Sequence, residues 1–318
     1  MIDVADYLDF LEREYLETFV AAGGAAVKFV VADDLSEGIW FTRLRDRGWQ
    51  HGFVTARVNA VTVKVQAIEQ VFFEIARQID WNDLVSRFLR QAYVELKLPP
   101  AADDDLVLRD VASHHSYDEG ELRRDLNRHL QQRVLHDYAM SQEFRIAMIR
   151  LGQHRAETGD VTEAEAGAVV AWLKGDLRQI SLLKSVGIYQ KVARHNARDL
   201  LFSLTHWLHV NGITGLIVDL DIRRLATLKR PAALEDRQGW YYTKATAMDT
   251  YEMLRQLIDN TDELRHCLVA VNCAPEFLTD PARGVDSYNA LKLRIYNDVH
   301  DRERDNPFSS LVRLGAPA

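Results

Sequence analysis

The sequence predicts an α/β fold in which a parallel β-sheet is interrupted by a long helical insertion. Short, largely apolar runs, each followed by a segment with helical periodicity, recur at residues 26–31, 52–58, 215–221 and 267–272. Between the second and third runs, residues 81–210 have helical periodicity almost throughout. Because strands joined through helices pair in parallel by right-handed crossovers, we expect residues 26–32 and 215–221 to be neighbours in one sheet.

The composition limits the classes of function. The chain has 318 residues, 39 Lys and Arg against 47 Asp and Glu, and a formal net charge of -8, so any DNA contact must come from a local basic patch. The two cysteines, Cys267 and Cys273, stand too far apart on one predicted strand to form a disulfide. The N-terminus is acidic and amphipathic, and no apolar run is long enough to span a bilayer, so we expect a cytoplasmic protein.

The elements follow in order. An amphipathic helix over residues 3–21 ends at Gly23-Gly24, and the first strand leads through a turn into a helix over 39–47. The second strand precedes a helix over 65–79. The remaining predicted helices cover residues 82–97, 119–136, 140–156, 162–174, 194–210, 243–260 and 287–299. This order predicts four parts: an N-terminal helix (1–25), a first core part (26–80), a helical insertion (81–210) and a second core part (211–318).

The strand 215–221 ends in aspartates, Asp219 and Asp221. Ligands of parallel α/β sheets bind at the carboxyl ends of the strands, and in a P-loop NTPase the magnesium-holding Asp stands there. Asp221 occupies that position, but Ile222 follows where an acid usually orients the attacking water. The alternative to a magnesium ligand is that Asp219 and Asp221 only cap the end of the strand.

The turn after the first strand is where a phosphate-binding loop would lie. Such a loop needs glycines to wrap the phosphates, a Lys for the β and γ phosphates and a Ser or Thr for magnesium. Residues 32–38 contain one glycine, no lysine and three acids, Asp33, Asp34 and Glu37, which would repel a triphosphate. The attraction of a helix N-terminus for anions, about 1 kcal/mol, does not offset three carboxylates.

Much of the chain resembles the ATP-binding proteins of bacteriophage-exclusion (BREX) loci, which are P-loop proteins related to the AAA+ class. The resemblance is strongest over Val271 to Leu278, reading VNCAPEFL, and over Asp280 to Ile295, which contains DPARGV, SY and AL. It extends to residues 196–221 and 47–58. It implies a P-loop, AAA+-like parallel sheet core.

Laid on the family pattern, the chain lacks the residues that grip phosphate. Asp221 and the sensor-like Asn272 stand at matching positions, while Ile222 replaces the family's acid. Family members also continue into a C-terminal lid after the Asn306-Pro307 segment, and we expect this chain to have none. The substituted positions are Ala32, Leu35 and Glu37 for glycines, Gly38 for the lysine and Ile39 for the hydroxyl, with Asp33, Asp34 and Ser36 between them. The resemblance therefore implies loss of ATPase activity.

Three further groups carry alternatives. Asn272 either acts as a sensor or satisfies a neighbouring backbone group, and Asp221 is either a metal ligand or a cap of the strand end. Arg283 is either an arginine finger acting on another subunit or part of a loop ion pair or subunit contact. The densest basic run either contacts nucleic acid or an acidic partner, or is a solvated loop. It consists of Arg223, Arg224, Lys229, Arg230 and Arg237.

The sequence thus predicts a pseudo-ATPase that serves as a scaffold or regulatory subunit of a defence complex, with no cofactor and no metal. Its partners would be proteins of the same operon, including an intact ATPase relative, and the prediction is compatible with an oligomer. One alternative is an ATPase with a divergent site that uses ATP and magnesium through Asp221, Asn272 and Arg283. Another is a DNA-binding subunit acting through Arg223 to Arg237.

Overall fold

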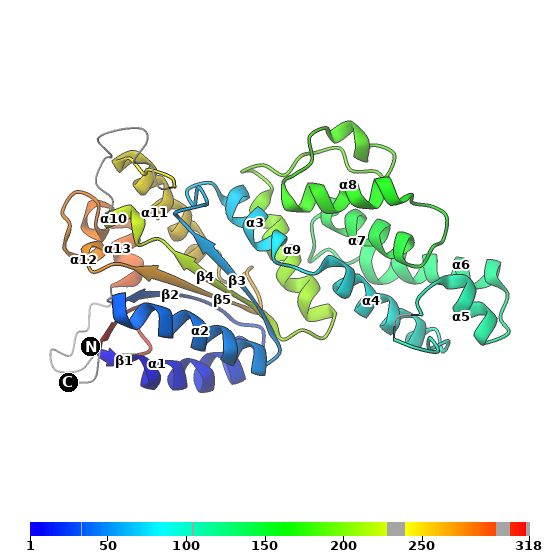
Figure 1. Ribbon diagram of the computed structural model, residues 1–318, viewed down its shortest axis with the longest axis horizontal. Coiled ribbons are helices and arrows are strands. Elements are labelled where there is room, and N and C mark those ends of the chain that lie inside the picture. The colour runs from blue at the N-terminus through cyan, green and yellow to red at the C-terminus, as the bar shows by residue number, and fades with distance from the viewer. Residues whose placement is uncertain (33, 104, 228–238, 297–305, 316–318) are drawn as a thin grey trace. The chain divides into compact units, whose positions relative to one another are not determined.

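The fold comes from a computed structural model that describes residues 1–32, 34–103, 105–227, 239–296 and 306–315 (Figure 1). For residues 34–38 and 227 it describes the backbone alone. The chain divides into two compact units, residues 1–75 with 213–318, and residues 76–212. The sequence predicted the helical insertion over 81–210.

The first unit contains a six-stranded, all-parallel sheet, which confirms the predicted α/β class. Its strands lie in the order β1-β6-β2-β5-β4-β3. They are β1 (Ile2–Asp3), β2 (Ala25–Val31), β3 (Phe53–Asn59), β4 (Gly215–Asp221), β5 (Cys267–Cys273) and β6 (Leu311–Gly315). All four predicted strands are present, and the sequence missed β1 and β6.

The prediction that residues 26–32 and 215–221 are neighbours in the sheet is wrong, because β5 lies between β2 and β4. Every residue of β4 and β5 is buried, and such strands favour the interior of a parallel sheet. Hydrophobic periodicity indicates that a strand is buried but not which strand lies beside it. Strand order is therefore a property of the tertiary fold.

Helices cover both faces of the sheet. Helix α1 (Val4–Leu11), the π-helix η1 (Glu12–Phe19) and helix α2 (Asp34–Gln50) pack on one face. Their shared core includes Tyr7 and Trp40, whose rings stack. On the other face, Phe277 packs against Phe29 of β2 and against Tyr251. The elements there are α10 (Arg224–Thr227), α11 (Lys244–Asp259), α12 (Glu276–Thr279) and α13 (Asn289–Ile295).

The second unit is helical throughout its described elements. It consists of the end of α3 (Ile68–Arg77), then α4 (Trp81–Glu95), α5 (Leu108–His114), α6 (Glu119–Leu130), η2 (Gln131–Leu135), α7 (Gln142–Arg155), α8 (Glu163–Lys174), η3 (Ile180–Leu183) and α9 (Ala197–Val210). The sequence missed the short helix α5. Helix α8 begins with a capping box formed by Thr162 and Glu165 and ends at Gly175 with φ of 76°.

Two predictions concern the cysteines and membrane spans. Cys267 and Cys273 are both free, as their spacing predicted. Both are also buried, and burial raises the pKa of each thiol. Within the described part of the chain, none of the helices combines the length and the hydrophobicity needed to cross a membrane.

Candidate functional site

The predicted site residues of β4 and β5 meet at the carboxyl edge of the sheet, where these strands end. Asn59 of β3, Asp221 of β4 and Asn272 of β5 stand side by side in the strand register. Two residues earlier on the same strands, Arg57 pairs in register with Asp219. The structure thus places the two candidate residues Asp221 and Asn272 on neighbouring strands, and it adds Arg57 and Asn59 to them.

Both carboxylate oxygens of Asp221 accept hydrogen bonds, mostly from Arg223. The Arg223 side chain donates from Nε to Oδ1 over 3.0 Å and from Nη2 to Oδ2 over 2.7 Å, and its backbone N–H donates to Oδ1 over 3.2 Å. Asn59 Nδ2 donates to Oδ2 over 3.3 Å, and Arg57 Nη2 lies 3.7 Å from the same oxygen. This bidentate arginine pair holds the carboxylate that the sequence offered as a magnesium ligand.

Asp219 is more deeply enclosed. Its side chain is 3% exposed, and its Oδ1 accepts a short hydrogen bond from Asn272 Nδ2. Its Oδ2 lies 3.3 Å from Arg57 Nε in an ion pair without hydrogen-bond geometry. Burial raises the pKa of the Asp219 carboxyl to about 6, and the contacts with Asn272 and Arg57 act in the opposite direction.

Arg57, like Asn59, is a residue that sequence reasoning missed. Its guanidinium reaches both aspartates and lies 4.3 Å from the centre of the Phe41 ring of α2, a cation–π contact. Two arginines therefore face two buried aspartates, so the formal charges of this group cancel. A polar Arg-x-Asn at the end of an otherwise apolar strand was the available signal, because polar side chains at buried strand ends need partners.

The turn after β2 differs from the sequence expectation. Helix α2 begins at Asp34, only three residues after the last residue of β2, whereas the sequence predicted a turn to Gly38 and a helix from Ile39. Asp33 lies outside the described residues, as do the side chains of residues 34–38. Ala32 donates its backbone N–H to the Cys273 carbonyl over 3.4 Å, which extends the β2–β5 pairing past the strand. Most of the predicted turn is thus helical backbone, because acids in a first turn stabilise a helix start.

Arg283 bonds within its own unit. Its Nη1 donates to the Leu225 carbonyl over 3.3 Å and its Nη2 to the Tyr241 hydroxyl over 3.0 Å. The adjacent Gly284 allows this loop to close, because a Cβ there would clash with the carbonyl oxygens of Asp280 and Phe277. These bonds test neither the arginine finger nor the loop ion pair or subunit contact, which stay predictions.

The basic run after β4 is only partly described. Arg223 is held by Asp221, and Arg224 Nε donates to the Trp240 carbonyl over 2.7 Å. Lys229, Arg230 and Arg237 lie outside the described residues. The structure therefore gives internal partners to the two arginines that it places, and nucleic-acid binding by this run stays a prediction.

The family of the chain is shown by its sequence. The sequence profile of the family described as BREX system ATP-binding protein BrxC/D matches residues 105–316, about two thirds of the chain. The matched range contains β4 and β5 with Asp219, Asp221 and Asn272, and it begins after the β2 turn. No curated protein and no solved structure matches the chain. The chain therefore belongs to the BREX system ATP-binding protein BrxC/D family.

Proposed function

We propose that this protein is a pseudo-ATPase of the BREX family that serves as a scaffold or regulatory subunit of an anti-phage defence complex. The observation that carries the proposal is the pairing of Asp221 with Arg223. A magnesium ion at Asp221 would have to displace a bidentate guanidinium in a buried site. Since Mg²⁺ in NTPases takes few protein ligands and depends on substrate phosphates for the rest, it has little to offset that loss.

The β2 turn supports the same proposal. A phosphate-binding loop wraps the phosphates with the N–H groups of an irregular, glycine-rich segment. In this chain the corresponding backbone is helical from Asp34 onward, so the N–H groups beyond the first turn are used inside the helix. The sequence adds acids at positions 33, 34 and 37 and supplies no lysine.

Calorimetric titration of the full chain with ATP and Mg²⁺ tests the loss of nucleotide binding. We expect no binding at micromolar affinity for the wild type. Arg223→Ala is the matched variant, because it removes the bidentate partner of Asp221 and leaves the sequence of the β2 turn unchanged. We expect it not to restore ATP binding, since the phosphate contacts would still be missing. Micromolar binding by the wild type that is lost on Asp221→Ala would refute the proposal.

The scaffold role needs a separate measurement. Co-expression with the intact ATPase encoded in the same operon, followed by size-exclusion chromatography, is expected to give a stable complex whose ATPase rate differs from that of the isolated partner. If the two proteins elute separately and the rate is unchanged, the scaffold role is wrong even where the loss of nucleotide binding holds.

A second candidate is ATP hydrolysis at a divergent site. The observation that favours it is Asp219, a buried carboxyl with a pKa raised to about 6 beside Asn272 and therefore suited to accept a proton near neutral pH. This candidate expects phosphate release that falls on Asp219→Asn and on Asp221→Ala. Absence of turnover, with the chain alone and with its operon partners, excludes it.

A further inference from the structure

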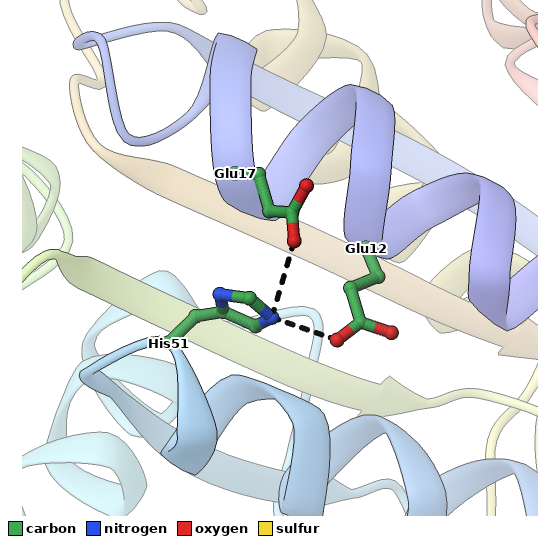
Figure 2. Close-up of side chains that lie close together, drawn as sticks. All are labelled: Glu12, Glu17 and His51. Atoms are coloured by element: carbon green, nitrogen blue, oxygen red, sulfur yellow. Dashed lines mark hydrogen bonds and ion pairs between the residues drawn. The ribbon is translucent and has the colours of Figure 1, made fainter.

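A second group of ionisable side chains lies at the amino edge of the sheet, where the strands begin. Figure 2 shows Glu12 and Glu17 of η1 facing His51, the residue that follows α2. His51 Nε2 lies 2.7 Å from Glu12 Oε1 and 3.9 Å from Glu17 Oε1. Among the described residues, these three offer metal-type donor atoms that all lie within 4.8 Å of one another.

The π-helix is what brings the two glutamates together. Residues five apart on an α-helix point about 140° away from each other. In a π-helix, with about 4.4 residues per turn, the difference falls to about 50°. Bonds across five residues maintain this form: Val20 N–H donates to the Tyr15 carbonyl over 2.8 Å, and the Thr18 hydroxyl donates to the Arg13 carbonyl over 3.1 Å. Such segments are rare and frequently occur at functional sites.

His51 is fixed from its own side. It directly follows α2, its backbone N–H donates to the Arg47 carbonyl over 3.1 Å, and its carbonyl accepts from Thr214 Oγ1 over 2.7 Å. The following Gly52 has φ of 74°, which turns the chain into β3. The imidazole therefore stands at the C-terminal end of a helix, where the helix dipole stabilises a cation.

The charges of this group do not cancel. Arg47 donates from Nη1 to Glu12 Oε2 over 2.6 Å and pairs with Asp9 through Nη2. Asp9, Glu12 and Glu17 thus have one arginine among them in these contacts. Because Arg47 takes one oxygen of Glu12, it orients the other oxygen toward His51, as the outer partners of metal ligands do.

From this geometry we propose that Glu12, Glu17 and His51 bind one divalent transition-metal ion, with Zn²⁺ as the first candidate. Zinc ligands at 2.0–2.1 Å from the metal lie about 3.3 Å apart, so Glu12 and His51 need to separate slightly and Glu17 to approach. The imidazole favours a transition metal over Mg²⁺ or Ca²⁺. Glu17 is 49% exposed, which leaves room for water to complete the coordination. A bound ion would join η1 to the end of α2, independently of the aspartates at the carboxyl edge.

Zinc titration of the tag-free, chelator-treated full chain tests this proposal. We expect one equivalent to bind with micromolar affinity, and Co²⁺ to give the visible absorption of a bound ion at the same site. Affinity should fall at least about tenfold in Glu17→Gln and in His51→Gln. It should also fall with decreasing pH, because protons compete with the metal ion for the ligand atoms. At 100 times Kd, Zn²⁺ should raise the Tm of the unit containing η1 by about 5 °C.

Glu14→Gln is the matched control, because Glu14 lies on the same π-helix but pairs with Arg13 over 2.8 Å. It should keep the affinity of the wild type. Circular dichroism shows whether each variant is folded, and Glu17→Gln keeps the test valid if His51→Gln is not. The absence of zinc uptake by the wild type, or uptake that neither variant weakens, would overturn the assignment and leave an ordinary histidine–carboxylate pair.

Discussion

Two groups of carboxylates lie at opposite edges of the same sheet. At the carboxyl edge, Asp219 and Asp221 are nearly fully buried and face two arginines, Arg57 and Arg223. At the amino edge, Glu12 is 26% exposed and Glu17 49% exposed, and Arg47 contacts Glu12 and Asp9. We propose that the acids paired with arginines at the carboxyl edge do not bind a metal ion, and that the acids left with excess negative charge at the amino edge do. Charge balance and burial, more than the number of acids, distinguish the two edges.

The largest expected effect comes from breaking the balance at the carboxyl edge. Arg57→Met keeps an apolar stem against Phe41 and leaves Asp219 buried without its cation. We expect a loss of about 3 kcal/mol in the free energy of unfolding at pH 7, because an uncompensated buried charge is costly. Urea denaturation measures it. Arg45→Met removes an exposed pair with Asp46 and should cost under about 0.5 kcal/mol. Equal losses in the two variants would break the comparison.

The second effect is the titration of Asp219. Burial raises the pKa of Asp219 from its ordinary value of 3.8 to about 6, so between these pH values the folded state retains a proton that the unfolded state has released. This group therefore stabilises the fold below about pH 4, and that contribution is lost as the pH rises through 6. The loss is on the order of 2–3 kcal/mol.

Asp219→Asn should remove that part of the pH dependence. The difference in unfolding free energy between wild type and variant, measured by urea denaturation at pH 4 and pH 7, isolates it from the other titrating groups. Asp46→Asn, at an exposed pair, should leave the profile of the wild type unchanged. If Asp219→Asn and the wild type have parallel profiles, Asp219 is ionised throughout, and its burial does not control its charge.

The third effect concerns the shared arginine of the amino edge. Arg47→Met removes the pairs with Glu12 and Asp9, and we expect a loss of about 1 kcal/mol at low salt, because these pairs are only partly buried. The loss should shrink as salt screens the remaining carboxylates. A double-mutant cycle with Glu12→Gln measures the coupling. A loss as large as that of Arg57→Met would show that the two edges do not differ in kind.

The smallest effect is expected at Glu17. In metal-free protein, Glu17→Gln should change the free energy of unfolding by less than about 0.5 kcal/mol, with a slight gain because a like charge near Glu12 is removed. Urea denaturation in the presence of a chelator measures it. A loss above about 1 kcal/mol would mean that Glu17 already stabilises the π-helix through His51 without any metal.

The sequence determined the elements that periodicity and burial dictate. Local sequence pattern was enough to predict the strands β2, β4 and β5 and the helices α4, α7 and α9. Asp221 and Asn272 could be singled out because each is a polar residue at or next to the end of a predicted strand. The prediction that Cys267 and Cys273 stay unbridged needed only their spacing. These features are readable because neighbouring residues in the chain carry the signal.

The tertiary structure decided which groups meet. Strand β6 is a short run that becomes a strand by pairing with β1 and with β2, where Leu311 lies opposite Phe29 although the two residues are far apart in the chain. The start of α2 at Asp34 replaced a predicted loop with helix. Arg57 reaches Asp219, and Glu17 reaches His51, across elements far apart in the sequence. Such pairings depend on strand order and helix form, which periodicity leaves open, and they decide whether an acid is neutralised or available to bind.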